Sequence, residues 1–437
     1  MNILAKEINS IIEEENFAIF SMLSSVGEKV FFPKGILSQS AEAKEKAHKF
    51  NATIGIATKN GKPMCFSGTA SYINGIEPVK CMTYAPSYGV LDLRKKWQKN
   101  IFEKNKSLSG KKISLPIVTC GITHGLSIIA DMWIDPDDVI IVPSMMWGNY
   151  NMIFSVRKGA KLSSYQLFTK NGAFNIKGFE EQIKKEALDH DKIMVLLNFP
   201  QNPTGYTVTE KEAGAIVEIL CNIAEKGKKV IALLDDSYFG LVYEDGVIKE
   251  SIFAKLACAH KNILAVKADG ATKEEFAWGL RVGFITYACN AQNSYEKLYE
   301  SLEKKTAGCV RGNISNASHL SQTLILNTMN HENYQKEKEE NFKILRGRAL
   351  KIKEILLDEK YKEMGEIYPF NSGYFMCIKV KDGVNAEALR KHLLNKYGVG
   401  VIAIGDTDIR VAFSCVEEKD IPELFDIILQ GIKELNG

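Results

Sequence analysis

The chain has 437 residues, of which 45% are hydrophobic and 25% are charged, and its formal net charge at pH 7 is +3. These values are typical of a globular protein in water, and the length favours two domains over one. Because basic and acidic residues are interspersed and the net charge is small, we expect neither a nucleic-acid partner nor an acidic membrane surface as partner.

The N-terminal residues M-N-I-L-A-K-E-I-N-S lack the basic-then-apolar pattern of a signal peptide. No uninterrupted apolar run approaches the roughly 18 residues of a membrane helix. Nine cysteines are scattered from Cys65 to Cys415 without a C-x-x-C pair, which favours reduced thiols and a cytoplasmic location. The seven histidines show no metal-ligand spacing, so we expect no metal site.

Four apolar runs in the middle of the chain predict buried parallel strands, because they are rich in Val, Ile and Leu at successive positions. They are D-V-I-I-V-P at 138–143, K-I-M-V-L-L-N-F at 192–199, K-V-I-A-L-L-D at 229–235 and N-I-L-A-V-K-A-D at 262–269. The segment between the second and third runs has apolar residues at helical spacing, begins with Thr209 and a glutamate three residues later, and ends at Gly227. Strand, helix and strand of these lengths predict a mostly parallel sheet within residues 80–300.

After residue 312 a long charged helical pattern leads to shorter strands and helices, which predicts a smaller α+β domain. We therefore expect three parts. They are an N-terminal segment at 1–79 that packs with the small domain, a large α/β domain at 80–311 and a small C-terminal domain at 312–437.

Polar motifs follow the predicted strands one after another, at the edge of the sheet where open α/β proteins bind ligands. They are T-C-G-I-T-H-G-L at 119–126, N-F-P-Q-N-P-T-G-Y at 198–206, A-L-L-D-D-S-Y-F at 232–239 and D-G-A-T-K-E-E-F-A-W-G-L-R-V-G-F at 269–284. Taken singly, each also fits a structural role: a helix start, a turn, a helix cap or a solvated loop.

The order and spacing of these motifs resemble those of the class I pyridoxal-phosphate aminotransferases of the aspartate aminotransferase type. The resemblance covers the chain from about residue 50 to the C-terminus. It implies the α/β fold of fold type I, in which a large domain with a mostly parallel seven-stranded sheet flanked by helices is joined to a smaller α+β domain. It also implies pyridoxal 5′-phosphate as the cofactor, bound in the large domain.

The resemblance assigns catalytic roles to three residues. Lys273 matches the lysine that forms the Schiff base and moves the proton during transfer, which requires a partly deprotonated amine. Asp235, three residues before Tyr238, matches the acid that keeps the pyridine nitrogen protonated. Tyr238 and Asn202 match the residues that hydrogen-bond the phenolic oxygen of the ring.

Further residues match the rest of the cofactor site. Arg281 matches the phosphate-binding arginine, and Gly121, Ile122 and Thr123 match the phosphate-binding turn. Trp147 matches the aromatic residue that stacks on the cofactor ring.

The segment Y-A-P-S-Y-G-V-L-D-L resembles the one whose tyrosine reaches the cofactor phosphate of the neighbouring subunit. This match assigns that role to Tyr84. It implies a homodimer with active sites at the interface.

The substrate residues come from the two ends of the chain. Arg410 in D-I-R-V-A-F-S matches the arginine that binds the α-carboxylate, and Gly55 lines the same side, together with Trp147 and Asn202. Arg311 matches an arginine that reaches across the dimer to a distal carboxylate, as in enzymes specific for aspartate or glutamate. Related enzymes that also accept aromatic substrates keep it.

The sequence departs from the pattern of aspartate aminotransferases at three places. Gly270 replaces a phosphate-binding serine, for which Thr272 or a water is the candidate replacement. Tyr150 stands where a histidine usually follows the tryptophan, and Ala317 and Ser318 replace two prolines. These changes indicate a divergent branch.

The resemblance implies an aminotransferase of amino-acid metabolism that moves an amino group from an L-amino acid to a 2-oxo acid. Aspartate, glutamate and aromatic amino acids are the candidate donors. A carbon–sulfur lyase or an amino-acid decarboxylase on the same fold is the nearest alternative, since such enzymes share most of these residues. A non-catalytic regulator would need a DNA-binding segment before the domain, and the short N-terminal segment is not basic enough for one.

Overall fold

The computed structural model describes residues 1–32 and 35–436. Its largest element is a seven-stranded sheet in the order β4 (Ile117–Thr119), β10 (Gly283–Ala288), β9 (Ile263–Gly270), β8 (Lys229–Asp235), β7 (Lys192–Leu197), β5 (Val139–Pro143) and β6 (Lys161–Tyr165). All neighbouring pairs are parallel except those of β10, which runs antiparallel to both β4 and β9. The predicted α/β class with a mostly parallel sheet is therefore confirmed.

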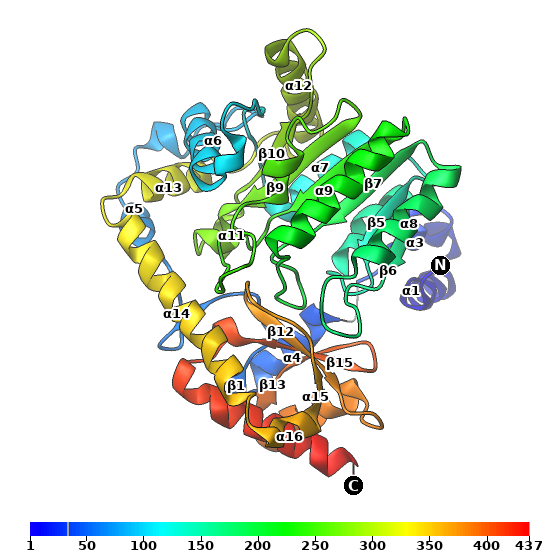
Figure 1. The fold of residues 1–437 in the computed structure, drawn as a ribbon, viewed down its shortest axis with the longest axis vertical. Helices are drawn as coiled ribbons and strands as arrows, with labels where there is room; N and C mark the ends of the chain where they lie inside the picture. The colour runs from blue at the N-terminus through cyan, green and yellow to red at the C-terminus, as the bar shows by residue number, and fades with distance from the viewer. Residues whose placement is uncertain (33–34, 437) are drawn as a thin grey trace.

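Helices cover both faces of this sheet, as parallel strands that are apolar on both sides require. One face packs against α6 (Leu91–Lys104), α8 (Ile176–Asp189), α9 (Glu210–Glu225), α10 (Ile252–Leu256) and α13 (His319–Asn330). The other face packs against α7 (Gly121–Trp133), α12 (Tyr295–Ile314) and the π-helical turn Asn151–Val156. Two apolar cores thus enclose the sheet (Figure 1).

The four predicted strands correspond to β5, β7, β8 and β9, each within two residues of its predicted ends. The predicted helix corresponds to α9. Thr209 caps its N-terminus in a capping box with Glu212, and Gly227, at a φ of +88°, follows its C-terminus.

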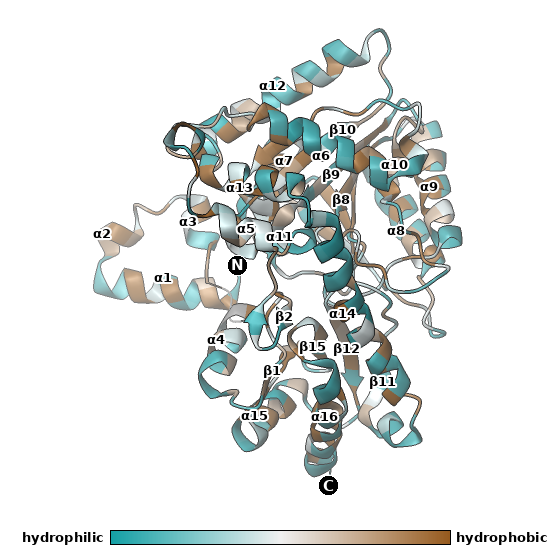
Figure 2. Ribbon diagram, turned by 90° about the vertical axis from the view of Figure 1, so that its left-hand side faces the viewer, coloured by the Kyte–Doolittle hydropathy of each residue, from teal (hydrophilic) through white to brown (hydrophobic). Residues whose placement is uncertain are grey.

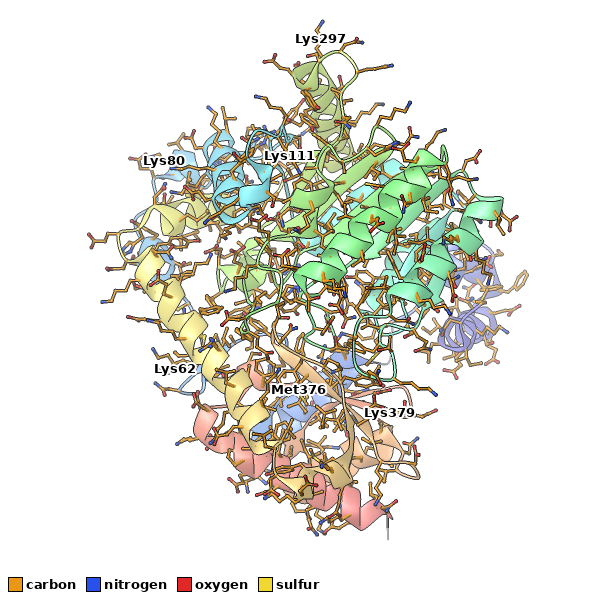
Figure 3. The ribbon with its side chains drawn as sticks, viewed as in Figure 1. Lys62, Lys80, Lys111, Lys297, Met376 and Lys379 are labelled. Atoms are coloured by element: carbon orange, nitrogen blue, oxygen red, sulfur yellow. The ribbon has the colours of Figure 1, made fainter. Side chains whose placement is uncertain are left out.

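A second, antiparallel sheet in the order β11 (Gly365–Ile367), β12 (Phe375–Val380), β15 (Asp408–Ala412) and β14 (Ile402–Ile404) forms the core of the small domain. It packs with α15 (Ala386–Tyr397), α16 (Ile421–Asn436) and the long helix α14 (Tyr334–Ile355), which runs from beside α13 to this domain (Figure 1). Figure 3 shows the stick of Met376 inside this domain, whereas Lys297 and Lys80 lie at the periphery.

The N-terminal part of the chain divides between the two domains. Helix α4 (Ile36–Lys46) and β1 (Phe50–Asn51) join the small domain, since β1 pairs with β13 (Val399–Gly400) and the amide of Gln39 exchanges two hydrogen bonds with Ala403. After the hairpin of β2 (Thr58–Lys59) and β3 (Lys62–Pro63), α5 (Ser67–Tyr72) instead contacts α13. The domain boundaries at 79/80 and 311/312 stay predictions.

The first three helices, α1 (Ile3–Glu15), α2 (Phe17–Phe20) and α3 (Ser25–Lys29), project from the body of the molecule (Figure 2). Exposed apolar side chains such as Ile11 and Phe17 lie on them. Within the described residues, no helix has both the length and the apolar character needed to cross a membrane.

The turn that ends β7 contacts the small domain so closely that only glycine fits at its fourth position. Gly205 has a φ of +74°, and its carbonyl accepts hydrogen bonds from the backbone N–H groups of Asn371 and Ser372. A Cβ at Gly205 would lie 2.0 Å from the carbonyl oxygen of Phe375. The Asn-Pro-Thr-Gly turn is therefore held against β12.

We expect Gly205→Ala to destabilise the protein by about 3 kcal/mol or more, because left-handed backbone strain adds to the clash with a backbone oxygen. Gly227→Ala is the matched control, since Gly227 also has a positive φ but no atom within 4 Å of a built Cβ. Its expected loss is about 1 kcal/mol. Urea unfolding followed by circular dichroism measures both, and equal losses would contradict the close contact.

Candidate functional site

A cavity of about 300 Å³ lies where the carboxyl ends of β7, β8 and β9 meet the N-terminus of α7 and the small domain. Ten of the residues selected from the sequence line it, namely Gly55, Ile122, Thr123, Trp147, Asn202, Asp235, Tyr238, Lys273, Arg281 and Arg410. Six further lining residues are Ile36, Tyr150, Asn198, Ser237, Thr272 and Phe375. Residues more than 350 positions apart in the sequence thus share one cavity.

Lys273 lies on the short helix α11 (Ala271–Glu274), directly after β9. Its amine is 5.1 Å from the centroid of the Tyr238 ring. Burial lowers the pKa of Lys273 to about 8; the carboxylate of Asp235 opposes this change and the nearby charge of Arg281 adds to it. A neutral, nucleophilic amine is therefore accessible near physiological pH.

Asp235 is the last residue of β8 and is 2% exposed. Its carboxylate accepts a hydrogen bond from the Tyr150 hydroxyl at 2.5 Å and others from the backbone N–H and hydroxyl of Ser237. Burial raises the pKa of Asp235, although these donors and Lys273 favour its ionised form. The site thus holds a carboxylate with preorganised donors next to an amine.

Asn198 connects the ends of two strands behind this carboxylate. Its amide donates to the backbone carbonyl of Asp235 at 2.7 Å, and its side-chain oxygen accepts from the backbone N–H of Asn202 at 2.9 Å. Sequence reasoning missed Asn198 and Ser237 as site residues, although both lie inside the motifs quoted for the site. The sequence analysis named Tyr150 only because it differs from the histidine usual at this position, and predicted no role for it in the site.

One end of the cavity is built to receive an anion. The side chain of Cys120 makes no capping hydrogen bond at the N-terminus of α7, so the first N–H groups there are open to a ligand. Gly121 has a φ of +76°, and a Cβ on it would lie 2.4 Å from the guanidinium of Arg281. The buried hydroxyl of Thr272 has no hydrogen-bond partner among the described residues.

Arg410, on β15, supplies a second cationic position. It is 2% exposed, donates to the side-chain oxygen of Asn202 at 3.1 Å and to the carbonyl of Thr53 at 2.9 Å, and lies 4.1 Å from the ring centroid of Phe375. Within residues 1–32 and 35–436 it makes these two hydrogen bonds but no ion pair with an acid, and its Nε has no hydrogen-bond partner. Burial lowers its pKa, so an anionic ligand would relieve an unfavourable desolvation.

Trp147 and Gly55 shape the walls between these charges. The indole of Trp147 meets the ring of Tyr150 edge to face at 5.4 Å. A Cβ on Gly55 would lie 3.3 Å from Phe375 and 3.6 Å from the Tyr238 hydroxyl. The absence of a side chain at Gly55 keeps that part of the cavity open.

Three selected residues lie outside the cavity lining. Gly121 packs behind Arg281 at the N-terminus of α7. Tyr84 is 89% exposed, and Arg311 is exposed near the end of α12, where it donates to the hydroxyl of Ser315 at 2.7 Å. In a single chain, neither Tyr84 nor Arg311 contributes to the cavity wall.

Comparison with known proteins gives one family. The profile of the family "Aminotransferase class I and II" matches residues 76–428. A probable aspartate/prephenate aminotransferase of Aquifex aeolicus is 25% identical over 80% of this chain and 82% of its own length. A shorter match, 28% identical, is to the aspartate aminotransferase of Sulfurisphaera tokodaii, of whose length the chain covers only 38%.

Solved structures share the fold over nearly the whole chain. The crystal structure of an aminotransferase from Anaerococcus prevotii superposes with a TM-score of 0.79 at 25% identity, covering 92% of this chain and 96% of that one. The cytoplasmic aspartate aminotransferase of Saccharomyces cerevisiae gives a TM-score of 0.76 at 18% identity and covers 96% of this chain and 100% of that one.

The electrostatics of the cavity predict how Lys273 responds to its neighbours. Asp235→Asn removes a negative charge that favours the ammonium, so the pKa of Lys273 should fall further below about 8. Arg281→Gln removes a repelling positive charge and should raise the pKa of Lys273. The measurement is the pH dependence of reductive methylation at Lys273, located by mass spectrometry. The exposed Lys62 serves as the internal control, and shifts in the opposite directions would contradict this account.

Proposed function

The chain belongs to the family of class I and II aminotransferases. On this basis we propose that it transfers an amino group from an L-amino acid to a 2-oxo acid, with pyridoxal 5′-phosphate as cofactor. One observation carries the proposal. A single cavity holds a low-pKa lysine, a buried aspartate and two separate cationic positions, at Arg281 and Arg410.

The residues present fit this cofactor. The uncapped N-terminus of α7, Arg281 and the unpartnered hydroxyl of Thr272 together suit a phosphate dianion. The Cβ that Gly121 lacks would collide with Arg281, so glycine there lets the guanidinium reach the same place. Thr272 thus takes the part of the serine that Gly270 replaces.

Asp235 and Lys273 would hold the opposite end of the cofactor. Asp235 would pair with a protonated ring nitrogen, for which Tyr150 and Ser237 orient its carboxylate. Lys273 would hold the cofactor covalently through a Schiff base, and Trp147 would stack on the ring. Asn202 and Tyr238 would hydrogen-bond the phenolic oxygen, and both line the cavity near Lys273.

When bound, pyridoxal 5′-phosphate supplies the carbonyl carbon that accepts the amino group and a cationic ring that withdraws electrons from the substrate Cα. The protein supplies the proton transfer. A Lys273 amine with a pKa of about 8 is largely neutral at slightly alkaline pH and can accept the Cα proton. Below about pH 8 its protonated fraction grows, so the rate should fall as the pH decreases.

Arg410 would bind the α-carboxylate of the substrate. One guanidinium nitrogen donates to the side chain of Asn202, which sets the guanidinium next to the cofactor position. The second terminal nitrogen donates to the carbonyl of Thr53, which fixes the orientation of the guanidinium. Bidentate binding of a carboxylate is the geometry that a guanidinium favours. The substrate Cα would then lie between Arg410 and Lys273, with Gly55 leaving the space for it.

We further propose a cytoplasmic homodimer in which Tyr84 and Arg311 complete the active site of the partner subunit. Both side chains are exposed in the single chain, and exposed apolar residues surround Tyr84 in the sequence, including Val79, Met82 and Leu91. All nine cysteines, which lie within the described residues, are free thiols and support a reducing compartment. Aspartate, glutamate and aromatic amino acids are the proposed donors.

The covalent role of Lys273 is tested first. Purified wild-type protein with added cofactor should be yellow, lose that absorbance with L-aspartate, L-glutamate or L-tyrosine in the absence of an acceptor, and carry the cofactor on Lys273 after borohydride reduction. Lys273→Ala should carry no reduced adduct and should lose at least about 10²–10⁴-fold in transfer rate. Mass spectrometry and stopped-flow absorbance measure the two effects.

Two outcomes would overturn this reading. A normal covalent adduct in Lys273→Ala would remove Lys273 from its role. Release of pyruvate and ammonia without a 2-oxo acid would indicate a lyase on the same fold instead.

The role of Arg311 predicts substrate-dependent losses. Arg311→Leu should lower kcat/KM for aspartate and glutamate about 10- to 100-fold, because a charge-assisted pair with the distal carboxylate is lost. The same ratio for phenylalanine and tyrosine should change less than about 3-fold. Lys305→Leu, an exposed position on the same helix, is the matched control. Equal losses for all four substrates would exclude Arg311 from distal recognition.

A further inference from the structure

A cluster of three buried ionisable residues lies beside the proposed active site but does not line it. The amine of Lys267 on β9 donates to the carboxylate of Asp236 and lies 3.4 Å from that of Asp269. The three side chains are 0%, 3% and 4% exposed. None of them touches the cavity in which Lys273 and Asp235 meet.

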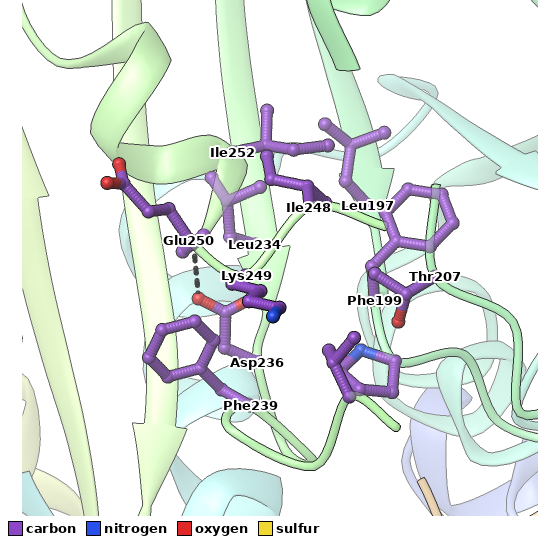
Figure 4. Close-up of a pocket in the computed structure, with 13 residues that line it drawn as sticks. Leu197, Phe199, Thr207, Leu234, Asp236, Phe239, Ile248, Lys249, Glu250 and Ile252 are labelled. Carbon is purple, nitrogen blue, oxygen red and sulfur yellow. Dashed lines mark hydrogen bonds between the residues drawn. The ribbon is translucent and has the colours of Figure 1, made fainter. Parts of the chain in front are cut away.

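Every partner of this cluster is also internal. The hydroxyl of Ser251 donates to Asp236 at 2.6 Å, and the indole N–H of Trp97 donates to both carboxylate oxygens of Asp269 at 3.1 Å. The amine of Lys267 lies 4.5 Å from the centroid of the Phe239 ring. Figure 4 shows Asp236, with its dashed hydrogen bond, next to Phe239.

The adjoining cavity is too small for a ligand. Its volume is about 10 Å³, which holds at most about one water molecule. This cavity therefore offers no ligand-sized space beside the cluster, which favours a role internal to the protein.

Strand alternation places the cluster on the opposite face of the sheet from the reaction. In the register of β8 and β9, Asp235 pairs with Ala268 and Leu234 pairs with Lys267. Since successive side chains of a strand point to opposite faces, Asp236, Lys267 and Asp269 share the face away from the Asp235 carboxylate. Leu234 belongs to the core on that face, and Ala268 to the core on the cavity face.

The cluster joins the two strand ends that carry the proposed catalytic groups. Asp236 directly follows Asp235, and Asp269 precedes Lys273 by four residues. Among the hydrogen bonds and ion pairs of the described residues, those of Lys267 alone reach both Asp236 and Asp269. The last paired residues of β8 and β9 are Asp235 and Ala268. The backbone N–H of Asp236 also donates to the carbonyl of Ala268, so the hydrogen bonding between the two strands continues one residue further along β8.

Stability alone does not account for such a cluster. Three well-packed apolar residues would fill the same volume without the cost of burying charge. Burial by itself lowers the pKa of Lys267, but the carboxylates of Asp236 and Asp269 outweigh it and raise that pKa, so the amine stays charged. Directional ion pairs fix geometry in a way that apolar contacts do not.

We propose that Lys267 is a positioning residue that, by binding Asp236 and Asp269, fixes the ends of β8 and β9 and thereby the separation of the Asp235 carboxylate and the Lys273 amine. The inference rests on the proposed function for the roles of those two groups. A displacement of about 1 Å in such a site lowers rates by about 10²-fold. The cluster acts only through Asp235 and Lys273 and touches neither substrate nor cofactor.

The test compares Lys267→Met and Asp236→Asn with the control Lys192→Met. Lys192 is also a lysine on a central strand with two aspartate partners, Asp138 at 2.6 Å and Asp135 at 3.6 Å, but it lies at the amino end of β7. The first two variants should keep the borohydride-reducible cofactor and lower kcat about 10- to 100-fold, with KM changed less than about 3-fold. The double variant should lose no more than the worse single one, because both act through one cluster.

A second measurement does not depend on activity. Hydrogen exchange followed by mass spectrometry, on protein without added cofactor, should show faster exchange in Lys267→Met at residues 235–238 and 269–274, with α12 and α16 unchanged. Lys192→Met should leave both segments and kcat as in the wild type. If Lys267→Met does not fold, Asp236→Asn, which keeps the shape of the side chain, carries the same test.

The outcomes separate this inference from the proposed function. Wild-type protein that binds no cofactor covalently would overturn the function, and the exchange measurement would still test the positioning. A wild type that transfers amino groups, with Lys267→Met within about 2-fold in kcat and unchanged in exchange, would overturn the positioning alone. Equal losses in Lys267→Met and Lys192→Met would also overturn it, since the effect would then be general.

Discussion

The site depends on one constraint, the burial of an amine and a carboxylate in a common cavity without a direct ion pair between them. If Lys273 and Asp235 paired, the carboxylate would keep the amine protonated, and the amine could not serve the nucleophilic role proposed for it. The structure prevents this by giving Asp235 donors of its own, from Tyr150 and Ser237, while burial and Arg281 lower the pKa of Lys273. The state of each group thus depends on where its neighbours lie, and the surrounding fold fixes those positions.

The large sheet fixes the positions of these groups by using both of its faces. The cavity face presents Asp235 and Lys273, the proposed reacting groups, at the strand ends. The opposite face carries Lys267 and its two aspartates among apolar side chains such as Leu234. Alternation along a strand makes this division automatic, because neighbouring residues on β8 point to opposite sides. The ion pairs of Lys267 can therefore hold the strand ends in place without forming bonds to Asp235 or Lys273.

The small domain completes the cavity from the other side. Arg410 comes from β15 and donates a side-chain hydrogen bond to Asn202, and Gly205 holds the turn that carries Asn202 against β12 through backbone hydrogen bonds. The residues proposed to bind substrate and cofactor are thus joined across the two domains. Arg410 has no acidic partner in the described chain, which leaves its charge available to a carboxylate. Tyr84 and Arg311 are exposed in the single chain, and their contribution to the site of a second subunit is a proposal.

The sequence by itself determined the parallel strands, the helix α9 and ten residues of the cavity. Runs of Val, Ile and Leu mark β5, β7, β8 and β9, and the capping box of Thr209 and Glu212 marks the start of α9, because these signals are local. The order and spacing of the motifs resemble those of a known family, and this resemblance was enough to collect residues from Gly55 to Arg410. Only the tertiary structure decided that Tyr150 bonds to Asp235, that the Thr272 hydroxyl is left without a partner, and that Lys267 joins Asp236 to Asp269. The physical reason is that these contacts arise from strand register and helix packing between distant segments, and no periodicity or spacing along the chain encodes them.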